Sequence, residues 1–140
     1  MRILLTCLSL GLAVGVLNCG SSDTTDNNRP PTGCNGQGGG PAGQVEVGNN
    51  LFRSAHNGTC NPAIDTVAVG SAVTWTWVNT GVTPHSVQSN PPSQGAPSFQ
   101  SSNTLTGAGS IYSVTFTTPG TFEYDCVVHG SQMTGRVVVQ

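Results

Sequence analysis

Residues 122–139 read FEYDCVVHGSQMTGRVVV, and this stretch shows how the end of the chain folds. Tyr124 and Cys126 share one face of an extended segment, because successive side chains of a β-strand point to opposite faces. The segment GRVVVQ at 135–140 is rich in β-branched residues, which favour strands. The pattern predicts two strands joined by a loop at residues 127–133, with Cys126 facing the interior.

The same alternation of apolar and polar residues recurs from Gln44 onward. It is clearest in AVTWTWVN (72–79) and SIYSVTF (110–116), and shorter candidate strands are QVEV (44–47), TVAV (66–69) and HSVQ (85–88). We find no segment with the period of a helix and no internal repeat. Residues 44–140 are therefore predicted to form one all-β domain, a sandwich of two sheets.

Composition and charge exclude several classes of function. Charged residues make up 7% of the chain and the net charge is -2, so no basic cluster could neutralise the phosphates of a nucleic acid. No Gly-x-Ser-x-Gly motif of a serine hydrolase occurs. The glycine-rich GQGGGPAG is not flanked by a strand and a helix, as a phosphate-binding loop would be.

The N-terminal residues have the character of an export signal. The apolar run Ile3–Leu17 is shorter than the roughly 20 residues that cross a bilayer. The segment VLNC that follows resembles the lipobox of bacterial lipoproteins, in which the cysteine is lipid-modified and becomes the new N-terminus. We therefore expect a signal peptide at 1–18 and a lipid on Cys19. Asn18 stands where that motif usually has Gly, Ala or Ser, so cleavage without a lipid is the alternative.

Residues 19–43 contain hardly any apolar side chains after the cysteine. Such a segment buries too little surface to offset the entropy of ordering. It is predicted to be a flexible tether between a membrane anchor and the domain.

The loop after Cys126 carries a concentration of possible metal ligands. His129 and Met133 lie on it, and Met133 is the only methionine besides Met1. A fourth ligand must come from elsewhere, and two other histidines exist. His85 follows Pro84 at the start of an extended run, whereas His56 lies in the polar, turn-like SAHNGTC and is interpreted as a solvated loop residue.

Two imidazoles, one thiolate and one thioether are the ligands of trigonal copper sites that transfer electrons. Zinc gains little from a thioether, and its structural sites favour cysteines paired at short spacing. The alternative readings are a disulfide or an inert core thiol for Cys126 and a core gap-filler for Met133.

These segments resemble the cupredoxin family, the plastocyanin and azurin class of blue copper proteins. The resemblance covers about residues 44–140 and includes NTGVTPHSV, FTTPGTFEYDC and CVVHGSQMTGRVVV. It implies a Greek-key β-sandwich that holds one type 1 copper ion. The implied ligands are His85, Cys126, His129 and Met133.

The resemblance also implies how the protein works. It would be a monomer outside the cytoplasm that exchanges single electrons with a donor and an acceptor redox protein, through the exposed edge of His129. One departure is Ser86, where many relatives have an Asn whose backbone N–H bonds the thiolate and whose side chain braces the ligand loop. Serine keeps the N–H but braces differently, which affects the redox potential.

The number of cysteines suggests how the remaining ones pair. Cys7 leaves with the signal peptide and Cys19 carries the lipid, so Cys34 and Cys60 are left to pair in an oxidising compartment. An enzyme with a second, histidine-rich copper centre is excluded, since only His56 would be left to build it. A copper carrier or delivery module without electron transfer is the alternative function.

Overall fold

The structure, a computed structural model, describes residue 34 and residues 37–79, 81–91, 93 and 95–140. The predicted signal peptide at 1–18 and the predicted lipid site Cys19 lie outside the described residues. All regular structure in the described part is β-strand, and no helix there could span a membrane. The prediction of an all-β fold is confirmed.

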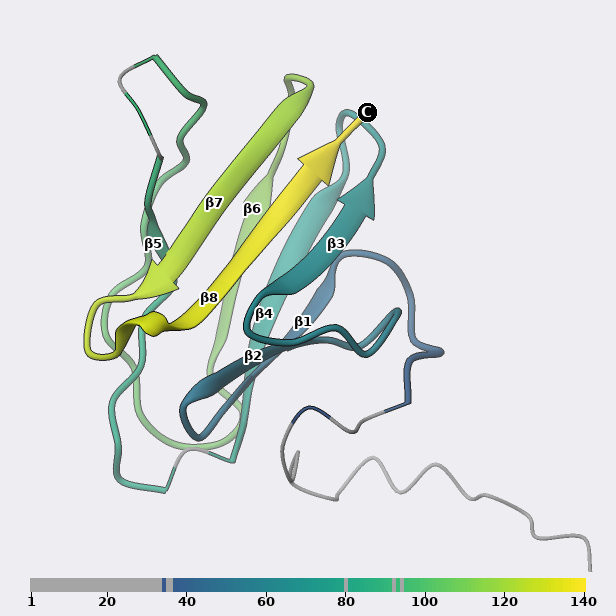
Figure 1. Cartoon of the computed structure of the whole chain (residues 1–140). Helices are drawn as coiled ribbons and strands as arrows, with labels where there is room; N and C mark the ends of the chain where they lie inside the picture. Colours follow the sequence, from purple (N-terminus) through teal and green to yellow (C-terminus); the bar gives the residue numbers. More distant parts are fainter. Residues whose placement is uncertain (1–33, 35–36, 80, 92, 94) are drawn as a thin grey trace, which may run out of the picture.

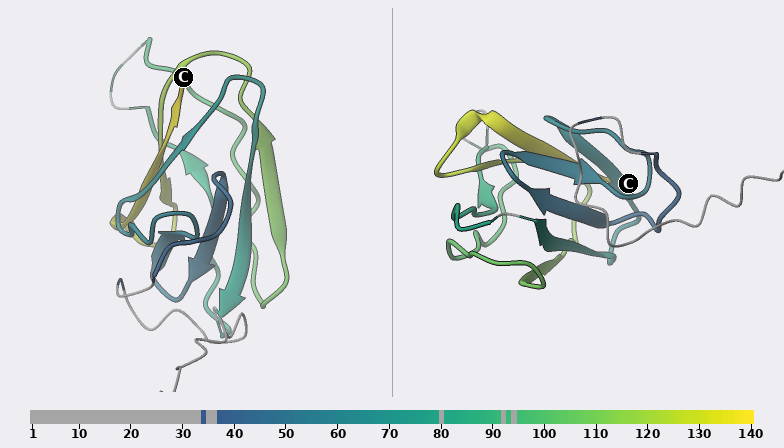
Figure 2. Two further views of the ribbon diagram at one scale, coloured as in Figure 1. Left: turned by 90° about the vertical axis from the view of Figure 1, so that its right-hand side faces the viewer. Right: turned by 90° about the horizontal axis from the view of Figure 1, so that it is seen from below.

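The strands form two facing sheets (Figures 1 and 2). One sheet has the order β2-β1-β4-β6 and the other β3-β8-β7-β5. The strands are β1 (Gln44–Gly48), β2 (Leu51–Ser54), β3 (Ala63–Val67), β4 (Ala72–Asn79), β5 (Gln88–Ser89), β6 (Ile111–Thr115), β7 (Gly120–Cys126) and β8 (Gly130–Val139). From β2 to β7 successive strands alternate between the two sheets, so the chain passes repeatedly from one sheet to the other, as in a Greek-key sandwich. Strands β1 and β4 run parallel, as do β3 and β8.

The core lies between the sheets and is aromatic at its centre. Trp75 and Trp77 of β4 are 0% exposed, which confirms the face assigned to them from the alternation. The ring of Trp75 meets Tyr124 of β7 edge-on at a centroid distance of 5.3 Å. Phe52 of β2 meets Tyr124 from another side at 4.9 Å. These contacts between opposite sheets fix how β7, which ends at Cys126, sits over β4.

The strand boundaries differ from the sequence prediction in several places. Strand β3 spans Ala63–Val67, whereas residues 66–69 were predicted. Strand β8 begins at Gly130, four or five residues earlier than expected, because a hairpin keeps pairing with β7 beyond the β-branched run. The segment HSVQ contributes only a bridge at His85 and the two-residue β5. Strand β2 was not predicted, since Arg53 and Ser54 interrupt its apolar pattern.

Residues 37–43, predicted as part of the flexible tether, instead have fixed contacts. The Gly39 N–H donates to His56 O at 2.8 Å, and the Gly43 N–H donates to Asp65 Oδ1 at 3.0 Å. A Cβ on Gly38 would lie 2.3 Å from His56 O, so only glycine lets this segment approach so closely. The glycine-rich composition of residues 37–43 suggested a flexible chain, but glycine also allows two stretches of backbone to pack closely together.

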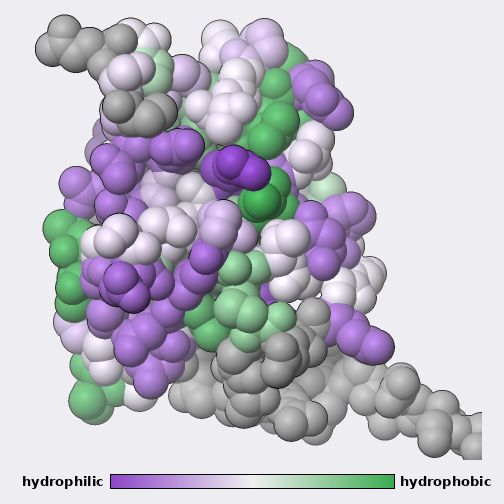
Figure 3. All heavy atoms as spheres, in the orientation of Figure 1, coloured by the Kyte–Doolittle hydropathy of each residue, from purple (hydrophilic) through white to green (hydrophobic). Residues whose placement is uncertain are grey.

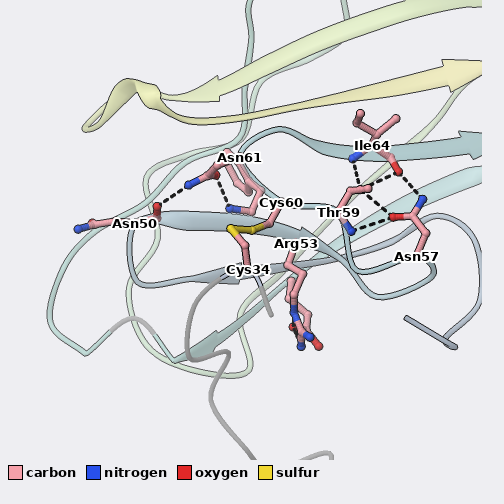
Figure 4. Close-up of a disulfide and its surroundings, with 10 residues drawn as sticks. Cys34, Asn50, Arg53, Asn57, Thr59, Cys60, Asn61 and Ile64 are labelled. Atoms are coloured by element: carbon pink, nitrogen blue, oxygen red, sulfur yellow. Dashed lines mark hydrogen bonds and ion pairs between the residues drawn. A yellow bond between two sulfur atoms is a disulfide. The ribbon is translucent and has the colours of Figure 1, made fainter. Parts of the chain in front are cut away.

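The described part of the N-terminal segment is also joined covalently to the domain. Cys34 and Cys60 form the disulfide expected from the cysteine count (Figure 4). Cys60 pairs with Arg53 of β2 through an isolated β-bridge, so the disulfide ties residue 34 to the edge of the first sheet. We refer to residue 34 and residues 37–43 as the strap.

Candidate metal centre

Cys126 is the last residue of β7 and lies at one end of the sandwich. Its side chain is 0% exposed, and it continues the inward face occupied by Phe122 and Tyr124. The inward orientation predicted from the alternation is confirmed. Cys126 is the free cysteine among the described residues, so its sulfur is available to a metal.

His129 is placed beside Cys126 by a tight turn. Its backbone N–H donates to Cys126 O at 3.0 Å, and Gly130 follows in the left-handed region with φ 51°. Glycine adopts this conformation without strain, so the turn closes after three residues. The turn brings His129 Nδ1 to 3.4 Å from Cys126 Sγ.

His85 reaches the same point from a distant part of the sequence. It lies in the connection between β4 and β5, where it pairs with Leu105 in an isolated antiparallel bridge. Its Nδ1 is 3.8 Å from Cys126 Sγ, across 41 positions of sequence. The His85 ring stacks on the His129 ring with centroids 4.8 Å apart.

The environment of His85 favours the neutral form of the ring. Burial, and secondarily the nearby His129, lower the pKa of His85 to about 4. The ring is therefore neutral at pH 7, and a proton on Nε2 leaves the lone pair of Nδ1 free toward Cys126. Nε2 is itself buried and has no hydrogen-bond partner among the residues that the structure describes.

Met133 lies on strand β8 and not, as predicted, on a loop. Asp125 of β7 pairs with Thr134 of β8, but the next residue of β7, Cys126, pairs with Gly130, which is four positions away from Thr134. This irregularity leaves residues 131–133 bulged out of the ladder. The Met133 side chain is 0% exposed and belongs to the same buried cluster as Cys126.

Ser86 connects the two halves of the site. Its backbone N–H points to Cys126 Sγ at 3.5 Å, the contact expected from the family resemblance. Its Oγ accepts a hydrogen bond from the Val127 N–H at 3.1 Å, so the shorter side chain still reaches the ligand turn. Leu105, which pairs with His85, was not predicted as part of the site; no local signal links two residues so far apart.

His56 lies outside this group. It is exposed, and its Nδ1 contacts Gly40 O at 2.9 Å. Its place in a loop agrees with the interpretation from sequence, and its ring contacts the strap.

The donor set fits copper. One ligand atom each from His85, Cys126 and His129 all lie within 4.8 Å of one another. Two imidazole nitrogens and a cysteine sulfur at this spacing match the main donors of trigonal copper sites, which also have a weakly bound methionine. Met133 is buried in the same core cluster as Cys126. Within the described part of the chain, the site lacks the second cysteine that structural zinc sites usually have.

Apolar side chains are exposed at the same end of the molecule. Val127 and Val128 of the turn are 58% and 48% exposed, and Val82 in the connection after β4 is 93% exposed. In Figure 3, two separate groups of hydrophobic residues lie on the left side, one near mid-height and one near the bottom, where Figure 1 places the β7–β8 turn and the connection after β4. His129 is half-buried between Val128 and Gly130. We call Val82, Val127 and Val128 the valine rim.

This chain matches a protein family in sequence and several solved structures in fold. The model of a family described as copper binding proteins, plastocyanin/azurin family, matches residues 53–140, more than half of the 140 residues. A mutant plastocyanin of fern is 30% identical, with 69% of this chain and 99% of that chain covered and a TM-score of 0.51.

Two further solved structures are similar at about the same level. A purple cupredoxin from Nitrosopumilus maritimus is 26% identical, with 69% of this chain and 98% of that chain covered and a TM-score of 0.50. A mutant of amicyanin in its Cu(I) form is 27% identical, with 73% of this chain and 85% of that chain covered and a TM-score of 0.51.

Proposed function

The chain belongs to the plastocyanin/azurin family of copper-binding proteins, and from this premise we propose that it carries single electrons between redox proteins outside the cytoplasm. Copper is its cofactor, and a bound copper ion supplies reversible one-electron chemistry at a site of this type. The observation that carries the proposal is that His85 Nδ1 and His129 Nδ1 lie 3.8 Å and 3.4 Å from the buried Cys126 Sγ.

The residues around this point hold the donor atoms in place. The ring stack holds the two imidazoles against each other, and Cys126 is fixed at the end of a strand anchored in the aromatic core. Donors held in advance need little rearrangement when charge is gained or lost, and this favours fast electron exchange. Ser86 N–H, directed at the sulfur, would stabilise the thiolate that binds copper.

We assign the four predicted ligands distinct roles. Cys126 would supply the thiolate that binds the ion most strongly, and His85 and His129 would supply the two imidazole nitrogens. Met133, buried on β8 in the same core cluster as Cys126, would supply a weakly bound thioether that tunes the potential. The site needs no further catalytic group, and we propose a carrier without enzymatic activity.

The electron leaves through His129. This ring is half-buried, whereas that of His85 is fully buried, so His129 is the ligand nearer to a docked partner. The valine rim lies on the same end of the molecule, and the net charge of -2 is small. We therefore propose a transient apolar contact between a monomer of this chain and a donor or acceptor protein, with little electrostatic steering.

The proposed location rests on the N-terminal sequence and on the disulfide. Disulfides persist in oxidising compartments, and the Cys34–Cys60 pair is of this kind. We propose that the protein is exported to the periplasm or cell surface and anchored by a lipid on Cys19. Mass spectrometry of the membrane fraction tests this: a mature N-terminus without an acyl chain would refute the anchor.

The decisive experiment adds Cu(II) to the purified protein. We expect an intense blue or purple colour from thiolate-to-copper charge transfer, bleached by a mild reductant and restored by an oxidant. Cys126→Ser removes the thiolate and should abolish the band. A copper complex that is colourless and redox-silent would favour the alternative function, copper transport or delivery without electron transfer.

A further inference from the structure

The backbone around His85 is held by a segment outside both sheets. The His85 N–H donates to Leu105 O at 2.9 Å, and the Leu105 N–H donates back to His85 O at 2.8 Å. Val87, two residues after His85, is held by the same segment, because the Ser102 N–H donates to Val87 O at 2.9 Å. Residues 101–105, which we call the buttress, therefore support the extended backbone of residues 85–87, which leads into β5, on the side away from β7.

The backbone N–H of Val87 is bonded to a side chain of the buttress and not to a backbone carbonyl. The Val87 N–H donates to Ser102 Oγ at 2.8 Å. The same hydroxyl donates its proton to Asn103 O at 2.8 Å, which leaves an oxygen lone pair for the Val87 N–H. Ser102 is thus bonded both to the buttress and to the strand that follows His85.

The residues between these bonds have little freedom. Val87 is 0% exposed, and Ser86 is held from the other side by Cys126 Sγ and the Val127 N–H. His85, Ser86 and Val87 are therefore each hydrogen-bonded to a different neighbour. Loss of the bond to Val87 leaves a buried N–H without its partner, and the strand must shift to satisfy it.

We propose that Ser102 is a positioning residue for the copper site, which fixes the imidazole of His85 through the Val87 N–H. The inference rests on the proposed function, because it assigns Ser102 a role toward the ligand His85. Ser102 contacts neither the donor atoms nor the metal. It acts by limiting how far the backbone of residues 85–87 moves.

The chain offers a matched control. Ser101 Oγ accepts a hydrogen bond from the Ser89 N–H at 3.0 Å, a bond of the same kind in the same buttress but farther from His85. Ser101→Ala deletes that bond and should leave the copper site unchanged. Ser102→Thr retains a hydroxyl and should behave as the wild type, whereas Ser102→Ala should not.

The first measurement uses the full-length protein without copper. Hydrogen exchange followed by NMR should show the amides of His85 and Val87 exchanging about tenfold faster in Ser102→Ala, as expected when a buried hydrogen bond is lost. Ser101→Ala should change exchange at Ser89 only. Equal exchange at Val87 in the two alanine variants would overturn the proposal.

The second measurement uses the copper-loaded protein. The copper hyperfine splitting in the electron paramagnetic resonance spectrum and the position of the charge-transfer band should change in Ser102→Ala and return in Ser102→Thr. A threonine variant that resembles the alanine variant, or an alanine variant with the wild-type spectrum, would refute the role. If the wild type itself shows no charge-transfer band, the proposed electron carrier fails, and the exchange measurement still decides whether Ser102 fixes His85.

Discussion

At the scale of single residues, burial decides what each histidine does. His85 is 0% exposed, and its lowered pKa keeps the ring neutral at pH 7, so a ring nitrogen has a lone pair available to a metal. His56 is exposed and contacts the backbone of the strap. Both lie close to turn-forming residues in the sequence, and the difference comes from the surroundings of each ring in the fold.

Substitution of these two histidines should separate the ligand from the loop residue. His85→Ala should remove the charge-transfer band, because one of three convergent donors is lost. His56→Ala should keep the band and cost about 1 kcal/mol or less, since one partly solvated hydrogen bond is removed. Absorption spectra of the copper-loaded variants and urea unfolding measure the two effects. Loss of the colour in His56→Ala alone would show that the ligand assignment is wrong.

Met133 offers a test of the axial position. Leucine has nearly the same volume, so Met133→Leu should cost less than about 1.5 kcal/mol in the free energy of unfolding. The thiolate and both imidazoles remain, so the coloured site should persist with a shifted midpoint potential. Voltammetry measures the shift. An unchanged potential would mean that the Met133 thioether is core filling and does not interact with copper.

At the scale of elements, the hairpin of β7 and β8 joins the aromatic core to the metal centre. Tyr124 pairs with Gly135 across the two strands, and its ring covers the place where a side chain at 135 would lie. A Cβ there would be 2.2 Å from Tyr124 Cζ. Tyr124 is fixed by Trp75 and Phe52 and cannot move aside. The absence of a side chain at 135 therefore positions the strand that ends at Cys126.

Gly135→Ala should destabilise the protein through this overlap. Overpacking of a filled core costs about 1–3 kcal/mol, and the rigid surroundings of Tyr124 put this variant at the upper end. Thr121→Ala, at an exposed site on β7, is the control and should change stability by about 0.5 kcal/mol or less. Urea denaturation compares the two variants. Equal stabilities would mean that Tyr124 has room to move in solution.

At the scale of the whole molecule, the strap and the copper site belong to different parts of the sandwich. The strap is joined to the end of β2 and to Cys60, whereas Cys126 and His129 lie in the hairpin of the other sheet. The disulfide closes a loop across 26 positions of sequence. It also holds residue 34 at the edge of the first sheet, next to β2.

Removal of the disulfide should therefore affect stability and not colour. A cross-link of this span stabilises by about 3 kcal/mol through the entropy of the unfolded chain. The double variant Cys34→Ser, Cys60→Ser should lose roughly this amount in thermal or urea unfolding and keep the charge-transfer band of the wild type. A changed spectrum at unchanged stability would show that the strap is coupled to the copper site.

The fold class, the inward face of Cys126 and the choice of copper could be predicted from the amino-acid sequence, because period-two alternation and the chemistry of thiol, imidazole and thioether are local properties. The sequence also left Cys34 and Cys60 as the pair for a disulfide. The tertiary structure decided that the glycine-rich strap is bound to the domain, that the ligand turn has three residues and that Met133 lies on β8. It alone brought His85 to Cys126 and supported it with the buttress. These features depend on contacts between residues far apart in the chain, and such contacts form only when the two sheets close on a common core.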